Sequence, residues 1–304
     1  MGAVLTRLFC SSVKVNNQRY YEVKKIGEGG YSFVYLVKDE QGALFALKKI
    51  SIELQEHQEF VRDEILSHLS LKGRRGVLQL VSYEIKPLIP GRSQGLLVFP
   101  FYSRGTVQEF VDRCPSVGLP VTEKLILRWS VSLCHAVAAF HGHNPPLAHR
   151  DIKPQNLLLT DDLQEVVLMD LGSVSSALKQ IRSTREALQL EEKCSVLCSA
   201  PYKAPELFAV SAWCDITEKT DIWSLGCTIY AMAFGQSPCD GSATSACCGS
   251  VRFPSLHSYS EEFVDFIRWI LAIKPEHRPS VGQIIDHIHT MASFSDEIIA
   301  ENLT

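Results

Sequence analysis

The chain has 304 residues, of which 46% are hydrophobic and 21% are charged, so it is long enough to bury one large core or two modest ones. That hydrophobic fraction excludes a chain that is disordered throughout, and the 18 Gly and 14 Pro exclude a collagen-like or low-complexity chain. A total of 30 Lys and Arg against 34 Asp and Glu gives a net charge of −4, which argues against a nucleic-acid partner bound by bulk charge.

The charge is unevenly distributed along the chain. Residues 1–25 carry five basic side chains against Glu22 alone, a local charge of +4 that leaves −8 for the remaining residues. A basic N-terminus on an acidic body can indicate attraction to anionic lipid, although a solvated tail is the commoner interpretation.

The 10 cysteines do not form a metal-binding pattern. No CxxC pair occurs, and neither Cys194 with Cys198 nor the Cys247–Cys248 doublet has the His or Cys partners of a zinc site. The N-terminus lacks the basic and apolar regions of a secretory signal, so we expect reduced and mostly buried cysteines in a cytosolic protein. The sequence contains no apolar run of about 18 residues, so no membrane-spanning segment is predicted.

The first third of the chain is predicted to be rich in strands. β-prone runs are separated by glycines and by a Pro-, Gly- and Ser-rich loop over 86–93. The predicted strands are 20–26, 31–37, 43–50, 77–84 and 94–100. Between the third and fourth, Phe60, Ile65 and Leu69 recur among charged residues and predict a helix over about 56–71.

After Arg104 and Gly105 the apolar residues recur at helical spacing. The predicted helices are 122–141, 222–235, 261–273 and 280–292. We therefore expect an α+β fold with two lobes, a small β-rich lobe joined near 100–105 to a larger helical lobe, and a ligand cleft between them.

A glycine-rich segment lies between the first two predicted strands. It reads Ile26-Gly27-Glu28-Gly29-Gly30-Tyr31-Ser32-Phe33-Val34. Glycines in such a turn let backbone amides approach phosphates, because no Cβ intervenes, although a plain tight hairpin is the simpler interpretation. A Rossmann site would instead place the glycines at the start of a helix. Ala46-Leu47-Lys48 follows on the third strand, where a lysine by itself is normally a surface charge.

A series of motifs then follows in a fixed order. They are His149-Arg150-Asp151-Ile152-Lys153-Pro154-Gln155-Asn156, Asp170-Leu171-Gly172, Ala204-Pro205-Glu206 and Asp221-Ile222-Trp223-Ser224-Leu225-Gly226. Their order and spacing match the signature set of protein kinases, and chance agreement of so many ordered motifs is negligible. The sequence therefore resembles a eukaryotic protein kinase over about residues 20–292.

The resemblance implies an ATP site. Lys48 would hold the α- and β-phosphates, braced by Glu64 on the helix over 56–71, with Glu59 and Asp63 as alternative braces. The remaining ATP-binding residues that the resemblance implies are the segment 26–34, Ala46, Phe99, Phe101, Tyr102 and Leu158. Three residues depart from the family pattern: Ser32 replaces the third glycine, Leu171 replaces a phenylalanine, and Pro100 removes one N–H donor.

The resemblance also implies a catalytic set, with Lys48, Glu64, Asp151, Lys153 and Asn156 as its members. Asp151 would accept the proton of the substrate hydroxyl. Asn156 and Asp170 would offer oxygen ligands to Mg²⁺, with Mn²⁺ as a second candidate. Lys153, two residues after Asp151, is the residue typical of serine/threonine kinases at that position. Ser199, where the family usually has threonine, would hydrogen-bond Asp151 and Lys153, and Glu206 would form a buried ion pair with Arg278.

Two features resemble the Numb-associated kinase group. One is the loop sequence at 27–32. The other is the stretch of 31 residues between Gly172 and Ala204, in which Ser183-Thr184-Arg185-Glu186 has the form of a capping box. We expect a short helix there, continuing over 187–193, with a mobile loop as the alternative.

The first residues, Met1-Gly2-Ala3-Val4-Leu5-Thr6, fit the pattern for myristoylation at Gly2. They point to the myristoylated and palmitoylated member of the group, whose palmitoylated cysteines would lie where this chain has Thr6 and Leu8. Cys10 is the cysteine available here, and basic residues are the alternative second signal. A cytosolic tail in which Gly2 is coincidental is a further alternative. The resemblance implies the cytoplasmic side of membranes, with the Golgi or trans-Golgi as the family's location.

The sequence as a whole predicts a membrane-associated serine/threonine protein kinase. Its expected partners are ATP, protein substrates and a membrane surface, and not nucleic acid. The expected organisation is a lipid-anchor segment over 1–19, a kinase domain over 20–292 with lobes of about 20–100 and 105–292, and a tail over 293–304. The alternatives are a pseudokinase scaffold that binds nucleotide without transfer and a small-molecule kinase, which Ala204-Pro205-Glu206 and Arg278 disfavour.

Overall fold

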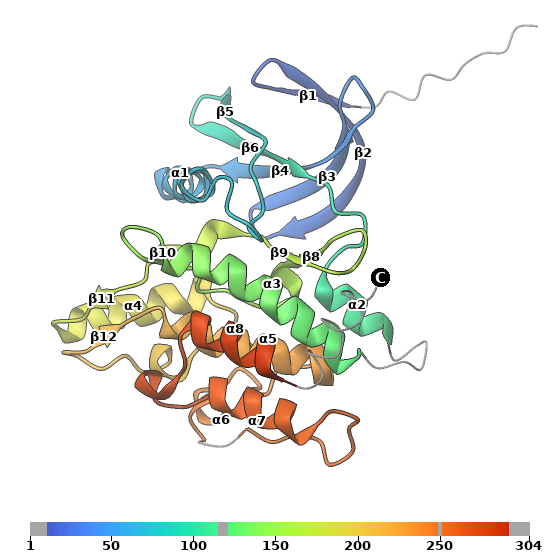
Figure 1. Ribbon diagram of the computed structural model, residues 1–304. Coiled ribbons are helices and arrows are strands. Elements are labelled where there is room, and N and C mark those ends of the chain that lie inside the picture. The colour runs from blue at the N-terminus through green and yellow to red at the C-terminus, as the bar shows by residue number, and fades with distance from the viewer. Residues whose placement is uncertain (1–10, 115–120, 249–250, 292–304) are drawn as a thin grey trace, which may run out of the picture. The chain divides into compact units, whose positions relative to one another are not determined.

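The computed structural model describes residues 11–114, 121–248 and 251–291. The chain forms two compact units, Met1–Lys72 with Leu78–Phe101 and Gly73–Val77 with Tyr102–Thr304 (Figure 1). The first unit is rich in strands and the second in helices, so the predicted α+β class is confirmed.

The first unit is a six-stranded antiparallel sheet with one helix. The strands are β1 (Ser12–Val15), β2 (Gln18–Gly29), β3 (Ser32–Lys38), β4 (Leu44–Ile52), β5 (Ser82–Ile89) and β6 (Arg92–Pro100), and they lie in the order β1-β2-β3-β4-β6-β5. Helix α1 (Gln55–Ser70) follows β4. One face of the sheet buries a core made of Val15, Tyr20, Val37, Leu47, Leu96 and Val98.

Strand β1 lies within the residues that we assigned to the lipid-anchor segment. It pairs with β2 through a turn at Asn16 and Asn17, whose φ angles are 45° and 68°. Asparagine tolerates positive φ, so two of them in succession favour the tight hairpin turn that matches strand twist. Residues 12–15 and 18–19 of the segment 1–19 that we assigned to the lipid anchor therefore belong to strands of the sheet, which the sequence did not predict. The missed signal was the alternation of Val13 and Val15 before this turn.

The fourth predicted strand was also misplaced. Residues 82–89 form β5, whereas we expected a strand over 77–84 and a loop over 86–93, and only the turn at Pro90 and Gly91 separates β5 from β6. Pro87 suggested a loop because proline cannot donate to a strand ladder. β5 is an edge strand, where that missing donor costs little.

The helix over 56–71 exists, but it buries a different face from the predicted one. Phe60 and Leu69, which we used to find the helical period, are each 40% exposed. The buried residues of α1 are Val61, Glu64, Ile65 and His68, spaced i, i+3, i+4 and i+7. A carboxylate therefore occupies a place on the buried stripe where an apolar residue is usual.

The second unit is built around helices (Figure 1). They are α2 (Val107–Arg113), α3 (Glu123–His141), α4 (Thr184–Leu197), α5 (Lys219–Phe234), α6 (Ala243–Cys247), α7 (Glu261–Ile270) and α8 (Val281–Thr290). Short 3₁₀ helices cover Pro154–Asn156, Leu171–Ser173, Ala200–Tyr202, Pro205–Leu207 and Pro275–His277. The predicted helices correspond to α3, α5, α7 and α8. α2 was missed, although Thr106 and Glu109 form a capping box that the sequence displays.

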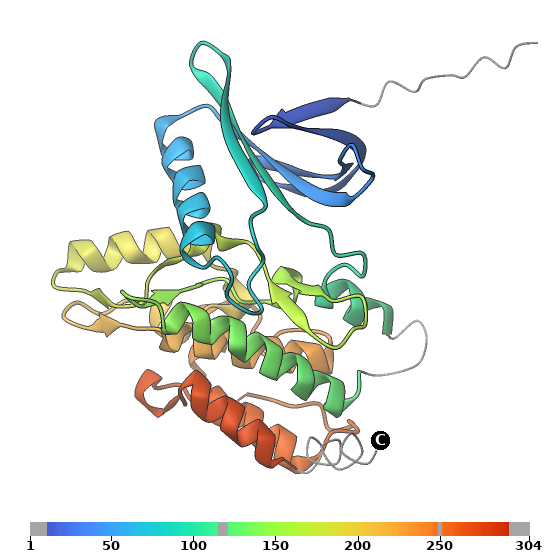
Figure 2. The same cartoon turned by 45° about the horizontal axis from the view of Figure 1, so that its top comes forward.

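Short strands connect these helices. β7 (Leu147–Ala148) pairs with β10 (Ser175–Ser176), β8 (Leu157–Leu159) with β9 (Val166–Leu168), and β11 (Lys179–Gln180) with β12 (Asp215–Ile216). Helix α5 is buried from Thr220 to Met232 and contacts α3 and α7, while α8 runs alongside α3 (Figure 2). A Cβ on Gly226 would lie 2.8 Å from Ile270 and Leu271, so glycine permits the close approach of α7.

The cysteines of the described chain are all free, as predicted. Five of them, Cys134, Cys194, Cys198, Cys227 and Cys239, are buried. Their side chains therefore contribute to the packing of the second unit, and Cys247 and Cys248 are the exposed ones.

Candidate active site

The glycine-rich segment forms the β2–β3 hairpin of the first unit. Gly27 pairs with Val34 and Gly29 with Ser32, which leaves Gly30 and Tyr31 at the turn. No atom lies within 4 Å of a Cβ built on Gly30, so the backbone at the tip is open to a ligand. The Tyr31 carbonyl accepts a hydrogen bond from the Ser51 amide at 2.9 Å, which ties the tip to the end of β4.

Lys48 and Glu64 form an ion pair inside this unit. The distance from Lys48 Nζ to Glu64 Oε1 is 2.7 Å, and the Glu64 side chain is 1% exposed. Glu59 and Asp63, the alternative partners, are exposed on the other side of α1. The contact between Lys48 and Glu64 is therefore confirmed, and α1 places Glu64 there because it lies on the buried stripe.

Three of the other predicted ATP-binding residues of the first unit, Val34, Ala46 and Phe99, share the sheet face of Lys48. Val34 pairs with Lys48, and Ala46 pairs with Phe99, so these side chains point to the same side as the Lys48 ammonium. Phe101 ends the unit. Tyr102 and Leu158 belong to the second unit, where Leu158 lies on β8.

Asp151 lies in the second unit with its carboxylate held from three directions. Its Oδ2 accepts hydrogen bonds from Lys153 Nζ at 2.7 Å and from Asn156 Nδ2 at 2.9 Å, while Oδ1 accepts from the Ser199 amide at 2.9 Å. The side chain of Lys153 also donates to Ser199 Oγ at 2.6 Å. The predicted contacts of Ser199 with Asp151 and Lys153 are therefore confirmed.

Asn156 and Asp170 lie at the same end of the β8–β9 hairpin. Leu157 pairs with Leu168, and the Met169 amide donates a hydrogen bond to the Asn156 carbonyl at 2.9 Å. Met169 therefore lies opposite Asn156, and Asp170 is the next residue. Asn156 Nδ2 donates to both the Oδ2 atom and the main-chain carbonyl of Asp151. The side-chain oxygen of Asn156 thereby faces away from Asp151.

This donor set fits a divalent cation bound together with phosphates. A carboxylate and an amide oxygen are hard ligands, and Mg²⁺ usually takes only one or two protein ligands when it also binds substrate phosphates. Within the described residues no group of three or more His, Cys, Asp and Glu side chains could hold a metal by itself. A protein-only metal cage is therefore not part of the described chain.

A family model for the protein kinase domain matches residues 20–289 of this chain. The chain belongs to the protein kinase family. Serine/threonine-protein kinase 16 of Rattus norvegicus is 35% identical to this kinase over 298 residues, 96% of each chain. The Homo sapiens protein of that name is 34% identical over 96% of each, and serine/threonine-protein kinase ppk13 of Schizosaccharomyces pombe is 32% identical over 95% of each. The predicted resemblance is confirmed.

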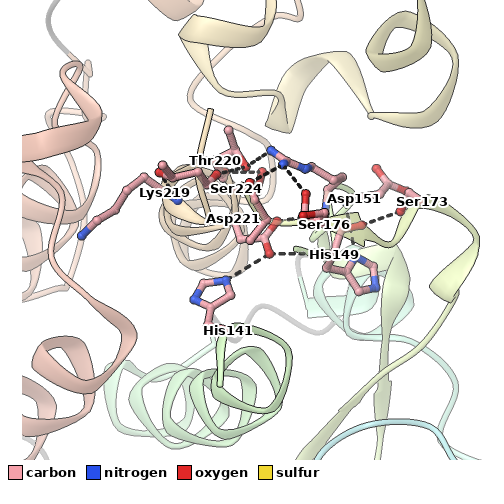
Figure 3. Close-up of polar contacts among 12 residues, drawn as sticks. His141, His149, Asp151, Ser173, Ser176, Lys219, Thr220, Asp221 and Ser224 are labelled. Atoms are coloured by element: carbon pink, nitrogen blue, oxygen red, sulfur yellow. Dashed lines mark hydrogen bonds and ion pairs between the residues drawn. The ribbon is translucent and has the colours of Figure 1, made fainter. Parts of the chain in front are cut away.

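The loop of the kinase that carries Asp151 rests on a buried carboxylate of α5 (Figure 3). Asp221 is fully buried and accepts hydrogen bonds from the amides of His149 at 2.7 Å and Arg150 at 2.8 Å, and its Oδ2 lies 3.1 Å from His141 Nε2. Burial alone would raise the pKa of Asp221, but the hydrogen bond and charge of His141, with Arg150, outweigh burial and lower that pKa. Asp221 therefore holds the loop as a carboxylate.

The guanidinium of Arg150 connects the same loop to the segment after Asp170. It donates to Thr220 Oγ1 at 2.6 Å and to the carbonyls of Ser176 and Ala177 at 3.2 and 2.9 Å. Arg150 has a φ of 70°, an uncommon backbone conformation that these contacts hold in place. The sequence predicted no role for Asp221 beyond its place in a motif and none for His141, since no local spacing brings α3 and α5 together.

The stretch between Gly172 and Ala204 contains the predicted helix, and α4 is longer than expected. Ser183 Oγ accepts a hydrogen bond from the Glu186 amide, as a capping box requires. The carboxylate of Glu186 accepts from the Arg182 amide instead of the Ser183 amide, so only half of the predicted box forms. Glu191 fastens the other side of α4, because its Oε1 accepts from the Val210 amide at 2.6 Å.

The predicted ion pair between Glu206 and Arg278 is confirmed as a bidentate contact. Arg278 Nη1 and Nη2 lie 2.7 and 2.8 Å from the two Glu206 oxygens, and Arg278 is 2% exposed. Its remaining donors bind the carbonyls of Ala272, Lys219 and Ile273, so the buried charge is fully surrounded by acceptors. Gly2 and Cys10 lie outside the described residues.

Proposed function

We propose that this kinase transfers the γ-phosphoryl group of ATP to serine and threonine hydroxyls of proteins. The observation that carries the proposal is the Asp151 carboxylate, which Lys153, Asn156 and the Ser199 amide fix in one orientation. A carboxylate held in this way can accept the proton of an attacking hydroxyl. The names of the relatives, all serine/threonine-protein kinases, support the choice of acceptor.

The residues of the chain divide the work between binding and proton transfer. Lys48, braced by Glu64, offers a fixed cation to the phosphates, and the open backbone of the β2–β3 turn offers amide groups. Asp151 accepts the proton, and Lys153 sets a cation beside it. Asn156 and Asp170 would hold Mg²⁺, which supplies neutralisation of the phosphate charge when bound.

Substitution of Asp151 separates this proposal from the pseudokinase alternative. We expect purified wild-type protein to phosphorylate a generic protein substrate, to yield phosphoserine or phosphothreonine, and to lose about 10²–10⁴-fold of its activity in Asp151→Asn. Asp286→Asn, at an exposed position of α8, is the matched control and should retain activity. Nucleotide binding by the wild type with transfer no higher than in Asp151→Asn would support the pseudokinase.

We further propose that the kinase needs no activating kinase. Helix α4 is fastened at Ser183, Glu186 and Glu191 by hydrogen bonds that involve no phosphate. Protein made in bacteria should therefore be active, and phosphatase treatment should leave it so. An inert phosphatase-treated protein that an added kinase reactivates would contradict the proposal. Ser195 on α4 and Ser199 are the candidate sites of autophosphorylation.

Membrane association through Gly2 and Cys10 is the remaining part of the proposal. In the described residues no helix is long and apolar enough to cross a bilayer. One myristoyl chain binds membranes with a constant of only about 10⁴ M⁻¹, so a second signal is needed. We propose a thioester at Cys10, on the cytoplasmic side of Golgi or trans-Golgi membranes.

Cell fractionation tests the anchor. Gly2→Ala should move the kinase to the soluble fraction, and Cys10→Ser should weaken its retention. Full retention of Gly2→Ala on membranes would exclude myristoylation as the anchor. Retention of Cys10→Ser that a high-salt wash abolishes would assign the second signal to basic residues.

A further inference from the structure

Basic side chains gather on one face of the β1–β2–β3 sheet. Lys14 pairs directly with Arg19, and Tyr21, two residues after Arg19, pairs with Lys38. Directly paired residues point to the same side of a sheet, and so do residues two apart on one strand. Lys24 pairs with Leu36, and Leu36 lies two residues before Lys38 on β3. Lys24 therefore points to the same side of the sheet as the other three cations. We call these four exposed cations, Lys14, Arg19, Lys24 and Lys38, the basic face.

The pleat of the sheet separates the basic face from the hydrophobic core. Val15, Tyr20 and Val37, the neighbours of these cations along the strands, are each 0% exposed and belong to the core on the opposite side. The basic face is therefore the outward side of β1 and β2. Tyr21 is half-buried among the cations, and an aromatic ring with a polar tip suits a boundary between water and an apolar phase.

The acidic side chains near these strands are engaged elsewhere. Glu22 pairs with Lys49 on the other face at 2.5 Å, and Glu84 pairs with Lys86 at 3.4 Å. Asp39 accepts hydrogen bonds from the amides of Gln41 and Ala43. Glu40, in the turn after Lys38, is the acid that remains nearby in the sequence. Among the described residues, no acidic side chain pairs with a cation of the basic face.

Lys14 opposite Arg19 is an unfavourable arrangement for the isolated fold. Like charges directly opposed on two strands destabilise the pair. Residues outside 1–25 have a summed charge of −8. The general composition of the chain therefore does not account for a cluster of cations on this hairpin. An anionic partner in front of the hairpin would relieve this repulsion.

The position of the hairpin in the chain indicates which anion. Ser12, the first residue of β1, lies two residues after Cys10, and two residues span at most about 7 Å. That reach is shorter than the Debye length of about 8 Å at physiological ionic strength. If Cys10 carries an acyl chain, the start of β1 lies within electrostatic range of the lipid headgroups.

We propose that the basic face docks on an anionic membrane surface. The inference rests on the proposed membrane association and assigns part of that association to folded residues of the sheet. The face then adds affinity for anionic headgroups to the marginal affinity of one acyl chain, and it fixes which side of the β1–β2 hairpin faces the bilayer.

Vesicle binding by unmodified full-length protein tests the proposal independently of the anchor. Protein produced in bacteria, without acyl chains, is mixed with vesicles of 70% phosphatidylcholine and 30% phosphatidylserine. We expect binding that 0.5 M salt abolishes, and no binding to phosphatidylcholine alone. Each cation should contribute about five-fold in the partition constant, which corresponds to ~1 kcal/mol. Lys14→Gln combined with Arg19→Gln should therefore weaken binding about 25-fold.

The matched control removes two exposed cations outside the basic face. Lys72→Gln combined with Lys274→Gln should bind as the wild type does, because neither residue lies on the β1–β2–β3 strands. The unfolding temperature of Lys14→Gln with Arg19→Gln should be no lower than that of the wild type, since the two opposed charges are removed, and phosphate transfer should be unchanged in both double variants; these two results would show that the fold is intact. Equal binding by both double variants would overturn the proposal.

Binding to polyanions other than lipid is a separate outcome of the experiment. Failure of the wild type to bind phosphatidylserine vesicles, with tight binding to polyglutamate or duplex DNA that Lys14→Gln and Arg19→Gln abolish, would assign the basic face to another partner and overturn the membrane proposal. Since the protein carries no acyl chain here, neither result bears on Gly2 or on phosphate transfer. Those remain to be judged by fractionation and by Asp151→Asn.

Discussion

Ser199 Oγ lies 2.6 Å from Lys153 Nζ, although the two residues are 46 positions apart. The Ser199 amide also holds Asp151 at 2.9 Å. Ser199, two residues after the end of α4, therefore links this segment to both Asp151, the proposed base, and Lys153.

Removal of the Ser199 hydroxyl should lower catalysis. Ser199→Ala loses a hydrogen bond to a charged donor, worth about 1.5–3 kcal/mol, so we expect kcat to fall about 10–100-fold. Ser199→Thr keeps the hydroxyl and should restore activity, whereas Ser195→Ala, on the exposed side of α4, should have no effect. Steady-state kinetics check this. An Ala variant as active as the wild type would show that the backbone amide alone positions Asp151.

Substitution of Glu64 should lower kcat/KM for ATP, whereas substitution of an exposed glutamate on α1 should not. Glu64→Gln weakens the brace on Lys48, and we expect kcat/KM for ATP to fall about 10–100-fold, because a charge-assisted hydrogen bond becomes a neutral one. Glu59→Gln, an exposed change on the same helix, should leave kcat/KM unchanged. The comparison is made with ATP varied at saturating protein substrate. Equal effects of the two substitutions would contradict the assigned role of Glu64.

Asp221 should stabilise the second unit in its charged form. Asp221→Asn turns a buried acceptor partly into a donor that faces two amides, and we expect a loss of about 3–5 kcal/mol in the free energy of unfolding at neutral pH. The pKa of Asp221 is lowered in the folded state from its ordinary 3.8. Its contribution is therefore fully present above about pH 4 and is lost as the pH falls through the lowered pKa.

Urea denaturation of both proteins between pH 7 and pH 3 tests this expectation. The difference in unfolding free energy between the wild type and Asp221→Asn should stay constant from pH 7 down to about pH 4 and should then become smaller. Asp63→Asn, at an exposed position of α1, should change stability by no more than about 0.5 kcal/mol. A difference that widens as the pH falls from 7 to 5 would instead mean that the folded pKa of Asp221 is raised above its ordinary value.

Cys194 should be an unusually acidic thiol. The thiol of Cys198 donates a hydrogen bond to it, and with Arg150, Lys203 and Lys193 this outweighs burial and lowers the pKa of Cys194 to about 7. Alkylation by iodoacetamide, followed by mass spectrometry, should therefore rise to half its maximal rate near pH 7.

Two comparisons control the alkylation experiment. Cys198→Ala removes the hydrogen bond and should shift the half-maximal pH of Cys194 upward. Cys134, whose pKa burial raises, should stay unmodified over the same range. A Cys194 that reacts only above pH 8.5 in the wild type would show that burial dominates.

The secondary structure was predictable where local signals agreed with packing. Thr122 and Ser183 begin α3 and α4 as expected, because an N-cap acts on amides only three residues away. The errors occurred where position in the sheet decided. Pro87 is tolerated because β5 lies at an edge, and Phe60 and Leu69 are exposed because the rest of the unit packs against Glu64 and its neighbours on α1.

The sequence by itself determined the family, the order of the motifs and the contacts made within the loop 149–156. Asp151, Lys153 and Asn156 meet because they are at most five residues apart, and a short loop brings such neighbours together whatever surrounds it. The tertiary structure decided which distant groups complete them. Asp221 on α5 reaches the His149 amide across 72 positions, and His141 on α3 reaches Asp221 across 80. Such contacts depend on how helices pack, and no spacing along the chain encodes the distance between two helices.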